Sequence, residues 1–319
     1  MITLCMGAVR IPIADTFRIL LEKLYIGIGY EISVSYEQIV WQIRMPRIIL
    51  GFFAGSGLAL CGCVMQALVQ NPMADPYILG ISAGATLGAT SSLFLGLGTI
   101  SGIWAFLGAG IAYFLVLMLS SADGKTTSVK LILSGMIINA LLTAFSNFII
   151  AITGDADGIM SIKFWTMGSL TRANWNNIGV IAVIVVSAIL FFVIQAKTLD
   201  GLMLGEEVAT TIGINTFRCR LIYLLVISLL TGILVSICGT IGFMGLIIPH
   251  VARALAGTGH KGLIPIAALT GGIFMLWVDA AARSLIPNTE LPVGIFTAFI
   301  GAPFFVYVVV KKKYGFGGN

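Results

Sequence analysis

Charged side chains are scarce in this sequence. Asp, Glu, Lys and Arg make up 10% of its 319 residues, whereas an average soluble chain carries about 25%. Hydrophobic types reach 58%, and the mean hydropathy is +1.05. So few charges cannot coat a soluble domain of this length without leaving large apolar patches. The composition therefore excludes a soluble enzyme and a disordered chain, and it indicates a protein whose main solvent is lipid.

Patterns that carry chemistry are also missing. The net charge is +5, but no dense basic stripe with interleaved aromatic residues argues for nucleic-acid binding. The two histidines, His250 and His260, are not spaced for a metal, and no HExxH or Walker motif occurs. We expect no catalytic residue, metal or cofactor on this chain. The five cysteines form no CxxC pair, and we interpret them mainly as small core residues: Cys5, Cys61, Cys63, Cys219 and Cys238.

Long apolar runs, bounded by polar residues or by Gly and Pro, dominate the rest of the chain. Because these runs are continuous rather than alternating, they predict transmembrane helices and not a β-barrel. The expected fold is an all-α, polytopic helical bundle in one domain, residues 1–319. Nine spans are predicted, at 48–69, 78–98, 102–121, 131–152, 177–196, 221–239, 242–257, 262–286 and 292–310.

Loop charges predict the orientation. The chain ends near Lys311, Lys312 and Lys313, which favours a cytoplasmic C-terminus, and nine spans then place Met1 outside. Residues 1–9 are apolar but too short to cross a bilayer. They resemble the end of a further span, so we expect the natural chain to start upstream and to contain ten spans.

Two polar segments stand out between the spans. Residues 10–43 are expected outside the membrane, with a helix near 16–26 that either lies in the interface or packs on the bundle. The segment 197–220 carries both signs of charge, three glycines and apolar residues. It predicts two short cytoplasmic helices broken at a glycine. A docking surface for another protein is one interpretation, and a solvated linker is the other.

A few residues near or within spans need an explanation. Asp279 and Arg283 are spaced for a salt bridge within one helix. His250 follows Pro249 and is interpreted as a packing residue beside a kink. Arg44 and Arg47 precede a span on the predicted outer side. They form either an exposed cationic patch for acidic groups of a partner or a pair that snorkels to lipid phosphates.

Glycine spacing predicts close helix packing. Small residues recur four positions apart, and such spacing lets helices approach closely in lipid. The expected result is a tight bundle with a narrow path. The residues are Gly51, Gly55, Gly80, Gly84 and Gly88.

Three longer motifs occur along the chain. The first begins with Arg44-Met-Pro-Arg47 and continues through Gln66, Asn71-Pro72-Met-Ala-Asp75-Pro76 and Leu79-Gly-Ile-Ser-Ala-Gly84. The second is Gly239-Thr-Ile-Gly-Phe-Met-Gly-Leu-Ile-Ile-Pro249-His250-Val-Ala-Arg253. The third runs from Asp279-Ala-Ala-Ala-Arg283 through Glu290-Leu-Pro-Val-Gly294 to Gly301-Ala-Pro303. Together these motifs resemble the FecCD family of permease subunits of type II ABC importers for iron-siderophores, haem and vitamin B12.

The resemblance implies the fold, partners and location. Members have ten helices, and the first is largely missing here. They work in pairs, so a second permease copy, most simply in a homodimer, is expected beside two cytoplasmic ATPase subunits that hold ATP and Mg²⁺. A substrate-binding protein docks outside. The expected location is the cytoplasmic (inner) membrane of a prokaryote, with an iron-siderophore as the leading substrate and haem or cobalamin as alternatives.

The resemblance also assigns roles to residues. Arg44, Arg47 and Arg283 match arginines that receive acidic groups of the binding protein. Thr127 and Ser128 match a cytoplasmic gate, although Val129 departs from the small polar residue expected there. The coupling helices that contact the ATPase correspond to Leu204, Gly205, Glu206, Glu207 and Gly213. Packing or path residues would be Gln66, Asn71, Pro72, Gly84, Pro249 and His250.

A stand-alone secondary transporter or facilitator is the alternative. It predicts a coupling acid at the membrane midplane and needs no docking element. An intramembrane enzyme would need a nucleophile–base pair, and no such pair is recognisable in the sequence.

Overall fold

The structure, a computed structural model, consists of helices joined by loops and turns in the residues that it describes. These are 1–7, 9–23, 33–97, 101–121, 127–153, 156–286 and 289–311. No strand occurs within these ranges, so the all-α expectation is confirmed for them. The helices of the first half are α1 (Ile2–Cys5), α2 (Ile13–Lys23), α3 (Val34–Glu37), the π-helix η1 (Gln38–Arg44), α4 (Met45–Val69), the 3₁₀-helix η2 (Pro76–Leu79), α5 (Ile81–Phe94), α6 (Ser101–Ser120) and α7 (Ser128–Thr153).

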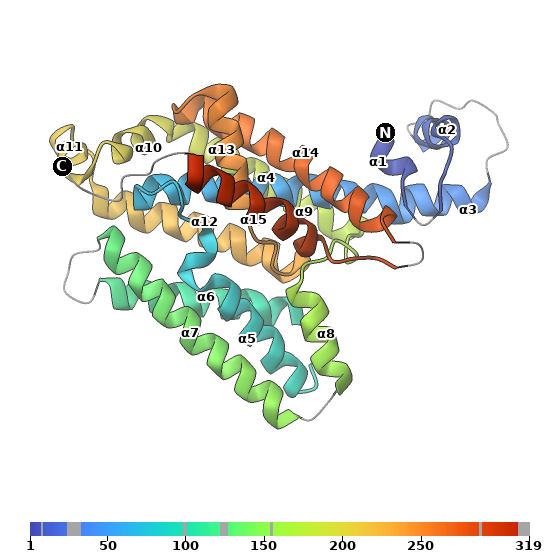
Figure 1. The fold of residues 1–319 in the computed structure, drawn as a ribbon, viewed down its shortest axis with the longest axis horizontal. Coiled ribbons are helices and arrows are strands. Elements are labelled where there is room, and N and C mark those ends of the chain that lie inside the picture. Colours follow the sequence, from blue (N-terminus) through green and yellow to red (C-terminus); the bar gives the residue numbers. More distant parts are fainter. Residues whose placement is uncertain are drawn as a thin grey trace.

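The second half continues the same pattern with both long and short helices. They are α8 (Ala156–Thr166), α9 (Trp175–Ile194), α10 (Ala196–Met203), α11 (Glu206–Thr211), α12 (Thr216–Cys238), α13 (Met244–Ala256), α14 (His260–Ser284) and α15 (Val293–Lys311). In Figure 1, α5, α6, α7 and α8 lie together on one side of the bundle. The α10 and α11 helices lie at one end, and α1 to α3 lie at the other.

Each predicted span coincides with a helix, but not all of them can cross a bilayer. Within the described residues, six helices are long and apolar enough. Of the other three, α5 has 14 residues and α13 has 13. At about 1.5 Å per residue, each covers about 20 Å of a hydrocarbon core about 30 Å thick. The prediction of nine full spans is therefore wrong for these two helices, and α15 is also classed among the shorter apolar helices.

The two short helices begin next to each other inside the protein. Gly80 and Phe243, which precede α5 and α13, both adopt left-handed backbone conformations, with φ of 69° and 67°. Their preceding loops meet where the Ile241 amide donates to the Tyr77 hydroxyl oxygen at 3.1 Å. Non-helical backbone at membrane depth is tolerated when protein covers it.

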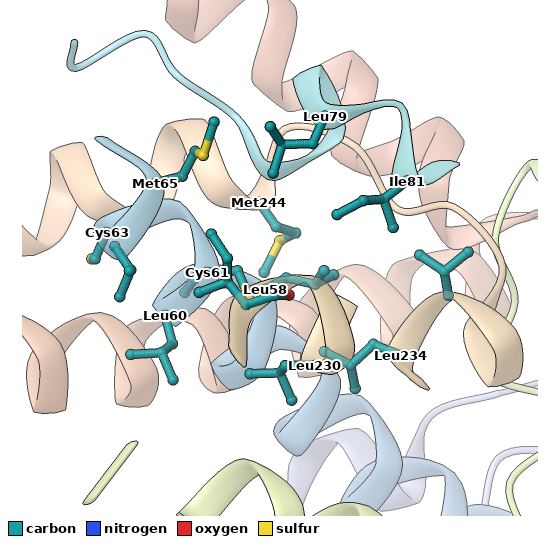
Figure 2. Close-up of a cluster of buried hydrophobic side chains, with 14 of the residues drawn as sticks. Leu58, Leu60, Cys61, Cys63, Met65, Leu79, Ile81, Leu230, Leu234 and Met244 are labelled. Atoms are coloured by element: carbon teal, nitrogen blue, oxygen red, sulfur yellow. The ribbon is translucent and has the colours of Figure 1, made fainter. Parts of the chain in front are cut away.

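The core is centred on α4. This helix is buried from Ala54 to Val69 and packs against α9, α12, α13 and α14. Figure 2 shows Leu58, Cys61 and Met65 of α4 among leucines of α12 and Met244 of α13. Three of the cysteines, Cys61, Cys63 and Cys238, are buried and all five are free thiols, so the packing interpretation holds for these three.

Close helix contacts confirm the glycine prediction. A Cβ added at Gly55 would overlap the backbone of Gly271 in α14, and one added at Gly84 would overlap Gly108 in α6. Gly88 likewise faces the backbone of Trp104. Helix axes can come this close in lipid only where side chains are absent. Gly80 instead forms the turn before α5.

The segment before α4 differs from the expectation in detail. The predicted helix near 16–26 is α2, Ile13–Lys23, and residues 24–26 lie outside the described part. Ile19 is buried against α1 and η1, whereas Ile13 and Phe17 are exposed, so α2 packs on its neighbours while its place at the membrane interface stays a prediction. Residues 34–43 continue α4 as α3 and η1. The 11 residues of α8 lie between two predicted spans, and no helix was predicted for them.

Candidate functional site

Five charged residues form an arginine–carboxylate cluster where α4 begins and α14 ends. Asp279 is at its centre: its Oδ1 accepts from Arg47 Nε at 2.7 Å, and its Oδ2 accepts from Arg283 Nε at 2.9 Å. Both bonds are charge-assisted and buried, which makes them stronger than neutral hydrogen bonds. The predicted salt bridge between Asp279 and Arg283 is confirmed.

Glu290 adds a second carboxylate from the loop before α15. Arg47 Nη1 donates to both of its oxygens, at 3.1 and 2.9 Å. Glu290 is 53% exposed, whereas Arg47 is 5% exposed at its side chain. Arg47 thus joins a buried acid to one at the protein surface.

The first residues of the chain cover the remaining guanidinium groups. Arg283 donates to the carbonyl oxygens of Met6 and Thr3 at 2.9 and 3.0 Å. Arg44, the last residue of η1, donates to the Leu4 oxygen at 2.6 Å and also bonds to the Val9 oxygen. Carbonyl dipoles therefore take the place of water around these two cations.

Burial corrects one expectation about the arginines. Arg44, Arg47 and Arg283 are only 5%, 4% and 6% exposed, so they do not form an exposed cationic patch. With two carboxylates for three guanidiniums, the cluster still carries one excess positive charge. Whether a partner docks on it is not tested by this geometry, and the docking role stays a prediction.

The second candidate site is the α10–α11 element, residues 196–213. The two predicted short helices are confirmed, with the break at Leu204 and Gly205. Gly205 and Gly213 have φ of 102° and 86°, which only glycine adopts without strain. Large apolar side chains on this element are exposed, at 63% for Leu204, 45% for Val208 and 58% for Ile212.

Polar bonds fasten this element to the long helices. Glu206 accepts from Arg220 of α12 at 3.0 Å, while Glu207 remains exposed. Asp200 of α10 bonds to His260 of α14, and Gln70 at the end of α4 bonds to Leu202. Sequence analysis missed Asp200, His260 and Gln70 as partners, because no local pattern links residues so far apart.

Most predicted path residues hold the fold together. Gln66 donates to the Gly245 oxygen at 3.0 Å and bonds to Arg253, which joins α4 to α13. Asn71 Oδ1 accepts from the Met73 amide at 2.8 Å in a turn next to Pro72. Pro249 lies inside α13 beside His250. Their role in a path therefore stays a prediction.

The predicted gate lies at the start of α7. Thr127 is exposed, and its hydroxyl accepts from the Lys130 amide at 3.3 Å, next to Ser128. Residues 122–126 of this loop lie outside the described part. The contact is a local helix cap, so it leaves the gate role untested.

A polar groove between α5, α7 and α8 is a feature that the sequence analysis overlooked. It has a volume of about 360 Å³. One stripe of α7 supplies Asn139, Thr143 and Asn147, which recur every four residues and are exposed. Polar residues spaced by one helical turn within an apolar span were the available signal, because such residues usually face a water-filled cavity or a helix neighbour. The groove also contains Ser82, Thr86, Ser146, Lys163 and Thr166.

A larger cavity lies on the other face of α8, next to the arginine–carboxylate cluster. Its volume is about 570 Å³. Glu290 belongs to both the cavity wall and the cluster, and Phe164, Trp165 and Arg172 also line it. The groove and the cavity therefore lie on different faces of α8. The groove faces α5 and α7, and the cavity faces the arginine–carboxylate cluster.

Comparison with known proteins identifies the class. Residues 1–311 match the FecCD transport family, so the chain belongs to this family. A cobalamin import permease of Halobacterium salinarum is 40% identical over 286 residues, covering 89% of this chain and 76% of the relative. A Fe(3+)-citrate import permease of Bacillus subtilis is 36% identical over 315 residues, covering 98% and 91%. A hemin transport permease of Yersinia pestis is 34% identical, covering 86% and 84%.

A solved structure supports the same class. An inward-facing ABC transporter, provisionally assigned to the metal-chelate type, matches with a TM-score of 0.81 at 32% identity, covering 93% of this chain and 98% of that chain. The protein is thus a multi-pass membrane permease subunit of an ABC transporter, and it is not itself the ATPase.

Proposed function

We propose that this chain is the membrane-spanning permease of an ATP-driven importer for a metal chelate, with an iron-siderophore as the first substrate to test and haem and cobalamin next. The observation that carries the proposal is the family match over residues 1–311. The names of its relatives support the substrate class, since they include cobalamin, hemin and Fe(3+)-citrate permeases.

The polar groove supports a path shared with a second permease copy. Lipid against Asn139, Thr143 and Asn147 would leave their amide and hydroxyl groups without partners, which is costly in hydrocarbon. A second copy that faces this groove, as in a homodimer, would enclose a polar channel. The stripe holds no acid, and such a channel could pass a bulky chelate without binding it tightly.

Two partner surfaces complete the proposal. The exposed leucine, valine and isoleucine of the α10–α11 element would receive the two ATPase subunits, which hold ATP and Mg²⁺. The arginine–carboxylate cluster would contact an extracytoplasmic binding protein. This assignment places α10–α11 and the C-terminus in the cytoplasm, residues 10–43 outside, and the protein in the plasma membrane of a prokaryote.

The mechanism requires no chemistry on this chain. Nucleotide binding would close the ATPase subunits and displace α10–α11, and the helices would then open the path to alternate sides. A ligand or nucleotide can shift this equilibrium only by its difference in affinity for the two states. A substrate released by the binding protein would pass through the groove beside α7.

A stand-alone secondary transporter is the alternative. Such a carrier usually needs an ionisable acid near the membrane midplane. In the six long spans, the acids are Glu37 and Asp279, both near helix ends, and Asp279 already holds two arginines. Asp75, which is buried in the loop before η2, already accepts from the Tyr77 amide at 2.8 Å. These positions favour the importer.

Reconstitution tests the function directly. The permease, its ATPase subunits and its binding protein would be placed in lipid vesicles and given ferric siderophores, haem and cobalamin in turn. We expect uptake of one chelate that stops when ATP or the binding protein is omitted. Uptake by the permease alone, driven by a gradient, would contradict the proposal and favour the secondary transporter.

A further inference from the structure

Two helices connect the candidate sites from end to end. The α4 helix carries Arg47 in its first turn, and Gln70 follows its last residue. The α14 helix begins at His260 and carries Asp279 near its end. At about 1.5 Å per residue, His260 and Asp279 lie about 30 Å apart. Both helices therefore reach from the α10–α11 element to the arginine–carboxylate cluster.

The two helices pack as one unit. Ser56 of α4 donates to the Ala268 carbonyl of α14 at 2.7 Å in a buried bond. Gly55 faces the backbone of Gly271, so the two backbones are in direct contact. Packed backbones without intervening flexible side chains slide little, because interiors are close-packed and transmit displacement.

Asp200 fastens α10 to the start of α14. Its Oδ1 accepts from the His260 amide at 2.9 Å and lies 2.6 Å from His260 Nδ1. The His260 side chain is 3% exposed and that of Asp200 is 44% exposed. A carboxylate at this place satisfies a free amide of the first helical turn and interacts favourably with the helix dipole.

Gln70 fastens α10 to the end of α4. It adopts the left-handed conformation that ends many helices, with φ of 55°. Its Nε2 donates to the Leu202 carbonyl at 2.8 Å. The two bonds start from Asp200 and Leu202 of the same short helix, so α10 is fixed to both long helices at one end.

We propose that α10, α4 and α14 move as one unit that links the α10–α11 element to the arginine–carboxylate cluster, and that Asp200 and Gln70 are the positioning residues of this link. The inference rests on the proposed function, since it assumes that the ATPase docks at one end and the binding protein at the other. A displacement of α10 then moves Arg47 and Asp279 together, and nucleotide state changes the affinity for the binding protein.

The test is a measurement of thermodynamic coupling, because contiguity in a structure is not evidence of coupling. The complete complex, permease with its ATPase subunits in lipid nanodiscs, is titrated with the binding protein, with and without a non-hydrolysable ATP analogue. In the unaltered complex we expect the analogue to change Kd by about tenfold, within the usual range of allosteric coupling. The variant with Asp200→Ala and Gln70→Ala should reduce this change to less than about twofold.

Two control variants separate coupling from folding. Asp200→Asn keeps an oxygen that accepts from His260 and should keep most of the nucleotide effect. Asp15→Ala removes a partly exposed ion pair on α2, far from α10, and should keep all of it. Each complex is first checked for its full complement of ATPase subunits. If the double variant does not assemble, the single Asp200→Ala variant carries the test and should lose at least half of the logarithmic effect.

The outcomes distinguish this inference from the proposed function. A full nucleotide effect in an assembled Asp200→Ala, Gln70→Ala complex would overturn the link and leave the importer intact. No nucleotide effect in the unaltered complex, or no binding of the binding protein, would overturn the docking arrangement and the link with it.

Discussion

The arginine–carboxylate cluster and the α10–α11 element differ in which kind of side chain they bury. In the cluster, polar groups are buried and partners come from the same chain: Asp279 is 1% exposed and holds two arginines. In the α10–α11 element, apolar side chains are exposed, as Leu204 is at 63%. A surface whose charges are already paired resists change, whereas an uncovered apolar surface gains free energy when a partner buries it. The first is therefore costly to mutate, and the second is suited to association.

The largest effect is expected at Asp279. Asp279→Ala would leave Arg47 and Arg283 buried without their shared carboxylate, and breaking a buried pair in this way costs about 3–5 kcal/mol. We expect a lower yield of folded protein and a strongly reduced Tm in detergent. Asp15→Ala on α2 is the matched control, since its partly exposed ion pair with Arg18 contributes less than about 1 kcal/mol. Equal Tm values for the two variants would contradict the importance of burial.

The helices that connect the two regions are the next test. Gly55→Ala would push a methyl group into the backbone of Gly271, and overpacking costs about 1–3 kcal/mol. Gly110→Ala is a matched change, because nothing lies within 4 Å of an added Cβ there. Thermal unfolding should separate the variants clearly, and a Gly55→Ala protein as stable as Gly110→Ala would refute the close α4–α14 contact.

Glu290 is the exposed member of the cluster and should matter less to stability. Glu290→Gln removes one of the two carboxylates on Arg47, at an expected cost of about 1 kcal/mol. The freed Arg47 should bind a partner carboxylate more tightly, so the Kd for the binding protein should fall severalfold in a titration. A weaker or unchanged Kd would remove Arg47 from the docking surface.

Glu290→Gln is a sharper test of docking than charge reversal at Arg47. Arg47→Glu is expected to weaken docking and to spare ATPase assembly. It would also place a third carboxylate beside Asp279 and Glu290, which disturbs folding. Loss of docking could then arise from either cause.

The smallest effect on stability is expected in the α10–α11 element. Glu207→Lys alters an exposed position, so the free energy of unfolding should change by less than about 1 kcal/mol, whereas adding Glu206→Lys would leave Arg220, whose side chain is 6% exposed, beside a second cation. Transport per ATP hydrolysed should nevertheless fall in vesicles. Normal coupling would count against a role of this element in contacting the ATPase.

Sequence reasoning was sufficient for features that depend on neighbours along the chain. The scarcity of charge indicated lipid, the apolar runs located the long helices, and a break at a glycine was expected within 197–220, where the structure has it at Gly205. The spacing of Asp279 and Arg283 predicted their salt bridge. The motifs also indicated the FecCD family, which the match over residues 1–311 confirmed.

Tertiary contacts decided the rest. Arg47 meets Asp279 across 232 positions of sequence, and Asp200 meets His260 across 60. The same arginines would be exposed or buried depending on those partners, and the sequence alone favoured exposure. The starts of α5 and α13 depend on two loops that meet where the Ile241 amide donates to the Tyr77 hydroxyl oxygen. Hydropathy and helical spacing are local properties of the chain, whereas burial, pairing and the ends of these short helices depend on which distant segment packs against them.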